Sequence, residues 1–151
     1  MPLIEQRVTI NRSVTDIFRF MSDFGNNPRW QPSGMRLERV GKLRMGDMIV
    51  GQQRMLGRMH FVNADVVDLT PNQRLAYTGV MGGYNFRTTY DYNRVAGGTE
   101  VIIRTDIRIP WFMFFVRPFV LSGVRWQIAT SLEKLKQVME DRLDLSAPPP
   151  R

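Results

Sequence analysis

The sequence contains no cysteine and only one histidine among its 151 residues. Without cysteine the chain forms no disulfide and carries no CxxC redox motif or thiolate metal site. A zinc site would have to rest on carboxylates and His60, whereas zinc in proteins usually takes cysteine and histidine ligands. We therefore expect no metal, and the absence of cysteine favours a reducing cytoplasm.

Motifs for nucleotide binding and for serine hydrolysis are also missing. The glycine pairs Gly82-Gly83 and Gly97-Gly98 lack the spacing of a phosphate-binding loop, so we interpret them as turns. No G-x-S-x-G pattern is present to supply a nucleophile that His60 would activate. No apolar run reaches the roughly 20 residues that a membrane-spanning helix requires. We expect no nucleotide and no other cofactor.

The formal net charge is +7, and the basic residues are spread along the chain without a run of five or more like charges. On two expected neighbouring strands, Arg87, Arg104 and Arg108 point outward with Asp91 and Asp106 between them. This mixture indicates a solvated, salt-bridged surface rather than a stripe that binds nucleic acid. Nucleic acid is therefore not an expected partner, while a weak contact with an anionic membrane stays an alternative.

What the sequence does contain is a series of strands between about residues 37 and 109, separated by glycine and proline turns. Two of these strands alternate with period two, which indicates an antiparallel sheet with one wet face. Their inward faces consist of Tyr84, Phe86, Thr88, Tyr90 and Tyr92 on the first strand, and of Val101, Ile103, Thr105, Ile107 and Ile109 on the second. Residues 4–10 predict one further strand at the start of the chain.

Helical patterns flank this region on both sides. Ser13, with Asp16 three residues later, predicts the capped start of a short helix, and residues 26–32 predict a turn or second short helix. After Pro118 an apolar residue recurs every three or four positions, which predicts one long helix. That stripe consists of Leu121, Val124, Ile128, Leu132, Leu135, Met139 and Leu143. We expect a single domain over residues 1–145 and a disordered, proline-rich tail over 146–151.

The stretch PWFMFFVRPFVL, residues 110–121, is the most unusual in the chain. On a helical wheel Trp111, Phe112, Phe115, Phe119 and Trp126 share one face, which points well over 100° away from the stripe above. One straight helix cannot bury both surfaces against one sheet. Either the chain breaks at Pro118 and residues 111–116 cover a cavity as a lid, or the aromatic face packs on a second subunit or a membrane. Burial of the run as plain core stays a further alternative.

Several stretches together identify a family resemblance that covers nearly the whole chain. They are VTINRSVTDIFRFMSDFGNNPRW, which includes Asp23 and Trp30, then Gly46 at the start of a strand, VVDLTPNQRLAY, GGTEVII and SLEKLKQVMED. The chain resembles the START/SRPBCC helix-grip superfamily, above all its polyketide cyclase/dehydrase and lipid-transport branch. Ser13 stands where the family usually has proline. The resemblance implies an α+β helix-grip fold, in which a strongly curved antiparallel sheet of about seven strands wraps around the long C-terminal helix, with two short helices after the first strand.

The resemblance and the strand faces together predict a cavity between the sheet and the long helix. We expect an enclosed pocket of roughly 300–1,000 Å³ that binds a small hydrophobic or amphipathic molecule for carriage, sensing or storage. The expected ligand-binding residues are Tyr84, Phe86, Thr88, Tyr90, Tyr92, Ile103, Thr105, Ile107, Trp111, Phe112, Phe115, Phe119, Leu121, Val124 and Ile128.

Two other functions stay open from the sequence. One is an enzyme similar to the polyketide cyclases and aromatases, for which Tyr90, Tyr92, Arg54 and His60 are the candidate catalytic residues. Its catalysis would consist mostly of positioning a bound chain beside one or two polar groups. The other is a lipid-transfer module that works at a membrane surface through the lid and the positive charge. A homodimer is possible in each case.

Overall fold

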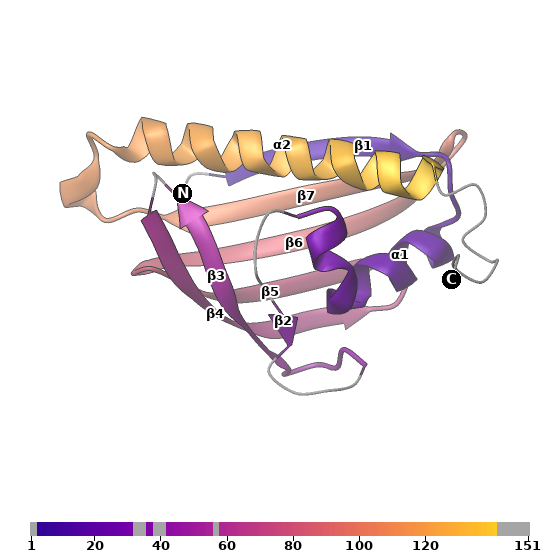
Figure 1. Cartoon of the computed structure of the whole chain (residues 1–151), viewed down its shortest axis with the longest axis horizontal. Helices are drawn as coiled ribbons and strands as arrows, with labels where there is room; N and C mark the ends of the chain where they lie inside the picture. Colours follow the sequence, from indigo (N-terminus) through magenta and orange to yellow (C-terminus); the bar gives the residue numbers. More distant parts are fainter. Residues whose placement is uncertain (1–2, 32–35, 38–41, 56–57, 142–151) are drawn as a thin grey trace.

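A computed structural model of the chain describes residues 3–31, 36–37, 42–55 and 58–141, with side chains at all of these positions except 3, 36, 54, 55 and 141. Its strands form one antiparallel sheet of seven strands in the order β1-β7-β6-β5-β4-β3-β2 (Figure 1). Six of the strands are long and β2 has only two residues. They are β1 (Leu3–Ile10), β2 (Arg36–Leu37), β3 (Met48–Met55), β4 (Arg58–Thr70), β5 (Arg74–Met81), β6 (Tyr84–Val95) and β7 (Gly98–Arg108). The predicted fold class is confirmed.

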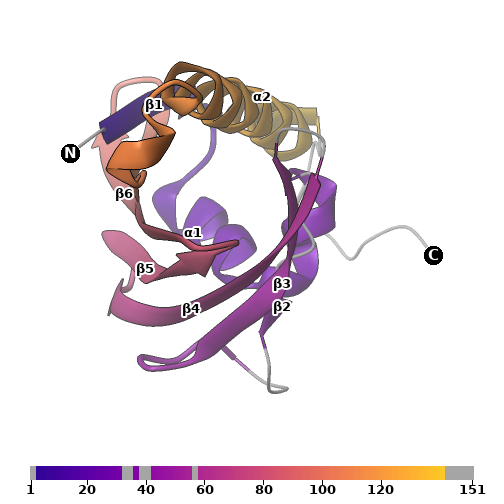
Figure 2. The same ribbon diagram turned by 90° about the vertical axis from the view of Figure 1, so that its left-hand side faces the viewer.

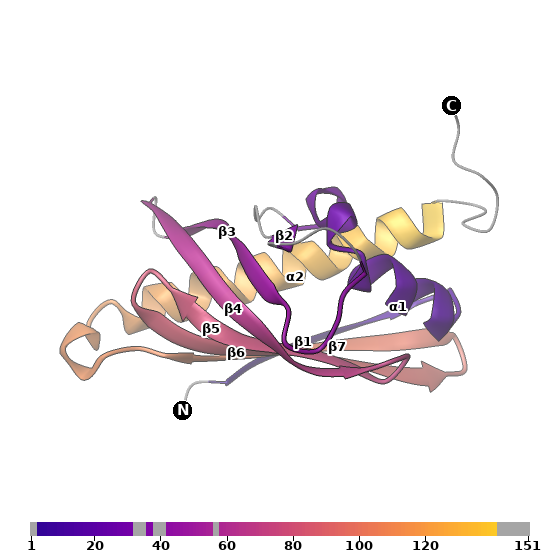
Figure 3. The ribbon, with the colours of Figure 1, turned by 90° about the horizontal axis from the view of Figure 1, so that it is seen from below.

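Two short helices follow β1, as predicted, and the second is a 3₁₀ helix. In α1 (Val14–Ser22) the Ser13 side chain accepts a hydrogen bond from the backbone N–H of Asp16 at 3.2 Å, which confirms the predicted cap. Asp23 then caps η1 (Phe24–Arg29) by accepting from Gly25 N–H at 3.0 Å. Figure 3 shows that α1 lies on the same side of the sheet as the long helix.

The sheet curves strongly because β4 and β5 depart from regular pairing. The β4–β5 register shifts between Val66 and Asp68, which is the mark of a β-bulge and bends the strand. Further along, a Cβ added to Gly79 of β5 would lie 2.0 Å from the carbonyl oxygen of Asn63, so only glycine permits this close approach of the two strands. As a result both sides of the sheet approach the long helix: the edge strand β1 on one side, and β3, next to the short edge strand β2, on the other (Figure 2).

The long helix α2 (Arg117–Asp141) runs along β1 and lies across the concave face of the sheet. Its inward side chains are apolar and belong to the core that also includes the inward residues of β4 to β7. The fully or nearly buried residues of α2 are Val120, Val124, Ser131, Leu132, Leu135 and Met139, and Leu121 and Ile128 are partly buried. The predicted stripe is therefore confirmed up to Met139, while Leu143 and the expected tail over residues 146–151 lie outside the described residues.

Polar contacts fix the C-terminal half of α2 to the end of β1. The Glu140 carboxylate accepts a hydrogen bond from the backbone N–H of Asn11 at 2.8 Å, and the Lys136 ammonium donates to the Thr9 carbonyl at 2.7 Å. Lys136 and Glu140 also form an ion pair with 2.9 Å between Nζ and Oε2. These contacts hold α2 in register with the sheet edge at the end opposite to the aromatic segment.

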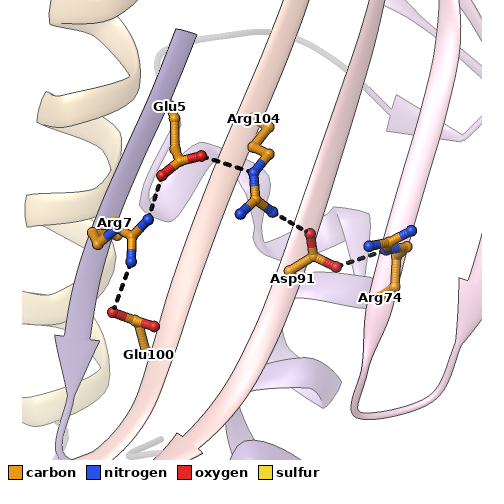
Figure 4. A network of polar contacts seen from close by, with 6 residues as sticks. All are labelled: Glu5, Arg7, Arg74, Asp91, Glu100 and Arg104. Carbon is orange, nitrogen blue, oxygen red and sulfur yellow. Dashed lines mark hydrogen bonds and ion pairs between the residues drawn. The ribbon is translucent and has the colours of Figure 1, made fainter. Parts of the chain in front are cut away.

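The convex face of the sheet carries a chain of ion pairs across β1, β7, β6 and β5, which Figure 4 shows. Asp91 receives both Arg104 and Arg74 at 2.6 Å, and Arg104 also reaches Glu5 at 2.8 Å. Glu5 in turn pairs with Arg7, and these hydrogen bonds lower the pKa of Glu5. The salt-bridged surface expected around Arg104 and Asp91 is confirmed.

Candidate functional site

A cavity lies between the concave face of the sheet and α2, at the predicted place. Its volume is about 80 Å³ and it is partly open to solvent. The expected enclosed pocket of several hundred cubic ångströms is therefore wrong, because large side chains such as Trp30, Tyr77 and Phe86 fill much of the space that the backbone encloses. A buried water needs at least about 10–15 Å³, so the cavity has room for several waters or for a slender ligand.

Most of the cavity wall is apolar. Strands β4 to β7 and helix α2 contribute Val62, Met81, Phe86, Ile103, Ile107, Val124 and Ile128. Among the described residues that line the cavity, none is Asp, Glu, Lys, Arg or His. A charged ligand group would find no counter-ion in this lining, so the cavity suits an uncharged molecule.

Neutral polar groups also line the cavity: Gln53 on β3 and Gln127 and Ser131 on α2 contribute some of them, and the others lie near Tyr90. The hydroxyls of Tyr77 on β5 and Tyr90 on β6 lie 2.9 Å apart, and the Gln31 side-chain amide donates to the Tyr90 hydroxyl at 3.1 Å. Beside them the hydroxyls of Thr88 and Thr105 lie 3.2 Å apart on the neighbouring strands β6 and β7. The wall therefore offers a connected set of neutral hydrogen-bonding groups.

Burial decides the protonation of the two tyrosines. It raises the pKa of Tyr77 well above its ordinary value, with the nearby Tyr90 as a second cause, although a hydrogen bond from Thr88 partly opposes the rise. Burial likewise raises the pKa of Tyr90, against which the hydrogen bonds of Tyr77 and Gln31 act. Both hydroxyls consequently keep their protons at neutral pH and act as hydrogen-bonding groups rather than as bases.

Trp30, at the end of η1, adds a donor that the protein does not satisfy. Its side chain is only 2% exposed and lines the cavity, with its ring 6.2 Å from that of Tyr90. Among the described residues, no atom accepts a hydrogen bond from its indole Nε1. A buried N–H without a partner costs about 1–3 kcal/mol.

The structure brings part of the predicted ligand-binding set to this cavity. The predicted residues that line it are Phe86, Thr88, Tyr90, Ile103, Thr105, Ile107, Val124 and Ile128. Tyr84 and Tyr92 are buried on the same strand face, but both are absent from the cavity lining and their hydroxyls donate to sulfur atoms instead, those of Met113 at 3.8 Å and Met21 at 3.4 Å. Leu121 is partly buried near the start of α2, also apart from the lining.

The aromatic segment departs from the lid expectation. The chain does break before the long helix, because Trp111–Met113 forms the separate 3₁₀ helix η2 and α2 begins at Arg117. Trp111, Phe112, Phe115 and Phe119 are nevertheless exposed by 60% to 85% and are absent from the cavity lining. The expectation that Trp111 and Phe115 cover the mouth is therefore wrong: the inward side chains of the segment are Ile109 and Met113, which anchor it to the core.

Of the four candidate catalytic residues, only Tyr90 lies at the cavity. Tyr92 is buried elsewhere in the core, and burial raises its pKa well above the ordinary value. His60 is half-buried on β4, where it packs against the turn at Gly82 with its ring 6.4 Å from that of Tyr84. Arg54 pairs with Met59 in the β3–β4 ladder, but its side chain lies outside the described ones.

Sequence reasoning missed Trp30, Gln31 and Tyr77 as site residues. Tyr77 stands in the strand LAYTGV, where its inward orientation depends on the pairing with β6 that sets it opposite Thr88. Trp30 and Gln31 follow η1 and reach the sheet only through the path of the chain after that helix. A tryptophan in an otherwise polar turn was the one signal available in the sequence.

The described residues also lack the patterns of metal sites and of membrane-spanning helices. No cluster of three or more His, Asp or Glu side chains in this part of the chain is arranged to hold a metal ion. Likewise, none of the helices in the described ranges is both long and apolar enough to cross a membrane.

The sequence of the chain matches a known protein family. The model of a family described as polyketide cyclase/dehydrase and lipid transport matches residues 1–140. None of the curated proteins matches the chain.

Solved structures share the fold at low sequence identity. Protein TTHA0849 from Thermus thermophilus is similar with a TM-score of 0.78 at 16% identity, covering 95% of this chain and 100% of its own. The Zhui aromatase/cyclase from Streptomyces sp. R1128 has a TM-score of 0.76 at 12% identity, with 98% and 99% covered. Protein CV1439 from Chromobacterium violaceum has a TM-score of 0.67 at 19% identity, with 93% and 99% covered. At such identities the likeness shows the fold alone.

Proposed function

This chain belongs to the polyketide cyclase/dehydrase and lipid transport family, and on that premise we propose that it binds a small, uncharged, hydrophobic molecule that carries an oxygen acceptor. The ligand occupies the cavity between the sheet and α2. Its apolar body contacts residues such as Ile107, Val124 and Ile128, and its oxygen faces the polar wall around Tyr90. Carriage, sensing and storage all require this same binding step.

The observation that carries the proposal is that Trp30, whose indole N–H is unsatisfied among the described residues, lines a mostly apolar cavity together with neutral hydroxyl and amide groups. Buried donors without a partner are uncommon in native proteins, and each one calls for an explanation such as a bound ligand or water. A few polar groups that converge in an apolar pocket are typical of small-molecule sites, where they fix the orientation of the ligand. A carbonyl or hydroxyl oxygen is the acceptor that matches an N–H without introducing charge.

The size of the cavity limits the ligand. A volume of about 80 Å³ accepts a slender molecule, or one part of a longer molecule whose remainder passes through the opening. Met81 lines the cavity close to the β5–β6 turn, and its flexible thioether side chain can adapt to ligands of different shape. A bulky ligand therefore requires rotamer changes rather than movement of the sheet.

A pair of matched probes tests the proposal. Acetophenone and ethylbenzene have similar shapes, but only acetophenone has an oxygen acceptor. We expect acetophenone to shift the NMR signal of the Trp30 indole N–H and to bind more tightly than ethylbenzene. Trp30→Phe keeps a ring and removes the donor, so it should reduce affinity for acetophenone by about tenfold, as expected for one hydrogen bond of ~1.4 kcal/mol, and leave ethylbenzene unchanged.

Equal binding of the two probes, or a Trp30 signal that neither probe shifts, would contradict the proposal. Native mass spectrometry of the freshly purified protein gives an independent measurement. A bound neutral metabolite should appear with wild-type protein and be depleted in Trp30→Phe. Trp126→Phe is the matched control, because Trp126 is exposed on α2 and absent from the cavity lining.

A cyclase-like or dehydrase-like activity is the second candidate, and the Tyr77–Tyr90 pair favours it. A protonated hydroxyl pair 2.9 Å apart can donate a hydrogen bond to a ligand carbonyl and polarise it. The cavity lining contains no carboxylate or imidazole among the described residues, so it offers no base at neutral pH. Tyr90→Phe should abolish such an activity on a ketone substrate while ethylbenzene binding persists; an unchanged turnover rate would reject this candidate.

A further inference from the structure

Six large aromatic side chains stand in water at one end of the molecule. They are Trp111, Phe112, Phe114, Phe115, Phe119 and Trp126, here called the aromatic end, and they are 60% to 85% exposed. Each such side chain forgoes the free energy that it would gain by leaving water for an apolar environment. Large apolar side chains that gather in water in this way on a folded protein mark an interaction site.

The aromatic end is built on an anchored backbone. The N–H groups of Met113, Phe114 and Val116 donate to the carbonyls of Pro110, Trp111 and Met113 at 2.9, 3.2 and 3.0 Å. Ile109 and Met113 pack against the core. The chain thus holds the aromatic rings outward by its own hydrogen bonds.

Other apolar side chains gather at the same end of the sheet. Asn85 pairs with Arg108 and Val62 pairs with Met81, so the β5–β6 turn, the start of β4 and the end of β7 lie together. Figure 2 looks onto this end. The exposed apolar residues there, besides the aromatic end, are Met59, Phe61 and Val80.

The charges at this end have one sign. Residues 107–132 contain three arginines and no acidic residue, and residues 48–64 and 79–90 contain no acidic residue either. Arg108, Arg117 and Arg125 are exposed, and in the described part of the chain none of them forms an ion pair. Asp106, the nearest acidic residue in the sequence, is half-buried on β7.

We propose that the aromatic end docks on the surface of an anionic phospholipid bilayer, with its rings in the interfacial layer and Arg108, Arg117 and Arg125 on the lipid phosphates. Aromatic side chains favour the level of the headgroups, where their rings leave bulk water. Basic residues beside them add attraction to anionic lipid. The proposal explains why exposed arginines without ion pairs and exposed aromatic rings occur together at this end.

A second copy of the chain fits this surface less well. A twofold contact would place the arginines of one aromatic end against those of the other, and Asp106, the acidic residue nearest to them in the sequence, is half-buried. An anionic bilayer provides both the apolar layer and the negative charge that the surface lacks. Charge complementarity therefore selects the lipid surface.

Docking at this end brings the bilayer close to the cavity. Met81 and Ile107 line the cavity and directly precede Gly82 and Arg108, which belong to the docking end. A neutral apolar ligand would then pass between the bilayer and the cavity over a short distance. This last step rests on the proposed function, whereas docking itself does not.

Vesicle binding tests the docking surface on the wild-type protein. The probes are vesicles of phosphatidylcholine alone and of phosphatidylcholine mixed with phosphatidylglycerol. Trp111 and Trp126 are exposed while Trp30 is buried, so tryptophan fluorescence should shift to shorter wavelength when the anionic vesicles are added. The protein should also sediment with these vesicles, and added salt should weaken the binding.

Substitutions at exposed positions separate the apolar from the charged contribution. Trp111→Ser/Phe112→Ser/Phe115→Ser should reduce partition into anionic vesicles by at least about tenfold. Met45→Ser/Val95→Ser, which changes exposed apolar residues far from this end, is the control and should bind as wild type does. Arg117→Gln/Arg125→Gln should cost about tenfold or more on anionic vesicles and little on phosphatidylcholine, unlike the remote pair Arg19→Gln/Arg94→Gln.

Three results would overturn the proposal. The first is no binding of the wild-type protein to anionic vesicles. The second is a dimer in solution that the triple serine variant converts to monomer. The third is binding of single-stranded nucleic acid that competes with the vesicles and needs the same rings. Trp30→Phe distinguishes the two proposals, because it should lose the acetophenone preference and keep vesicle binding.

Discussion

The last third of the chain has two apolar surfaces, and they differ in what covers them. Val124, Leu132, Leu135 and Met139 of α2 belong to the core beneath the sheet, and each is buried. Phe119 and Trp126, on the same helix, are mostly in water, as are the aromatic residues just before it. The covered surface uses branched aliphatic residues and methionine, whereas the uncovered one uses phenylalanine and tryptophan beside arginine.

The charged residues repeat this contrast. On the convex face of the sheet Arg7, Arg74 and Arg104 each meet a carboxylate of the same chain. At the aromatic end the arginines have no such neighbour in the described structure. Ion pairs between residues of the same chain contribute to the stability of the fold. Arginines without such a pair are available to bind another molecule. The arginines of the convex face therefore contribute to the fold, whereas those of the aromatic end belong to the proposed docking surface.

The largest expected effect comes from the covered surface. Leu135→Ala removes a fully buried side chain from α2 and should lower the free energy of unfolding by about 2–5 kcal/mol. Phe119→Ala, on the same helix, should change it by less than about 0.5 kcal/mol, because Phe119 is exposed. Urea denaturation of the two variants measures both values. A comparable loss for Phe119→Ala would mean that the aromatic end is covered within the protein itself.

The polar groups beneath the covered surface are expected to have an intermediate effect. Tyr90→Phe leaves Tyr77 and Gln31 without the hydroxyl that each contacts, so unfolding should require about 1–3 kcal/mol less. Tyr92→Phe loses only a contact to the sulfur of Met21 and should cost less. Thermal unfolding followed by circular dichroism should rank the variants in this order. If the two losses were equal, the hydroxyl chain at the cavity would have no special role.

The smallest effect concerns the contact between α2 and the end of β1. The Asn11 N–H and then the Lys136 ammonium lower the pKa of Glu140 below its ordinary 4.5. A lowered folded-state pKa stabilises the protein above pH 4.5, and this contribution disappears as the pH falls through the folded-state value. Glu140→Gln should therefore cost about 0.5 kcal/mol at neutral pH and nothing in acid. Unfolding curves measured from pH 7 downward should converge; a constant difference would show that protonation of Glu140 is irrelevant.

Local patterns in the sequence predicted the elements well. The Ser13 cap, the turns at Gly82-Gly83 and Gly97-Gly98, and the alternation of Tyr84 to Tyr92 all depend on neighbours close in the chain. These local patterns predict the structure correctly because the tertiary contacts favour the same caps, turns and strand faces. Even the break before α2 was one of the two solutions that the wheel analysis allowed.

The polar part of the site was much less predictable. Trp30, Gln31 and Tyr77 meet Tyr90 only because η1 returns the chain to the sheet and because β5 pairs with β6 in one particular register. A shift of that register by one residue would turn Tyr77 to the opposite face. The size of the cavity depends in turn on the rotamers of these large side chains, which the sequence does not specify position by position.

By itself, the sequence determined the order of the elements, the faces of the strands, the buried stripe of α2 and the presence of an apolar surface that this stripe could not share. These features follow from periodicity, which the chain carries locally. The tertiary structure alone decided that Trp111, Phe115 and Phe119 face water, that the cavity is narrow, and that the Trp30 donor lacks a partner among the described residues. The physical reason is that hydrophobicity sets how strongly a side chain avoids water, whereas only the three-dimensional arrangement of the other elements sets whether anything is there to cover it.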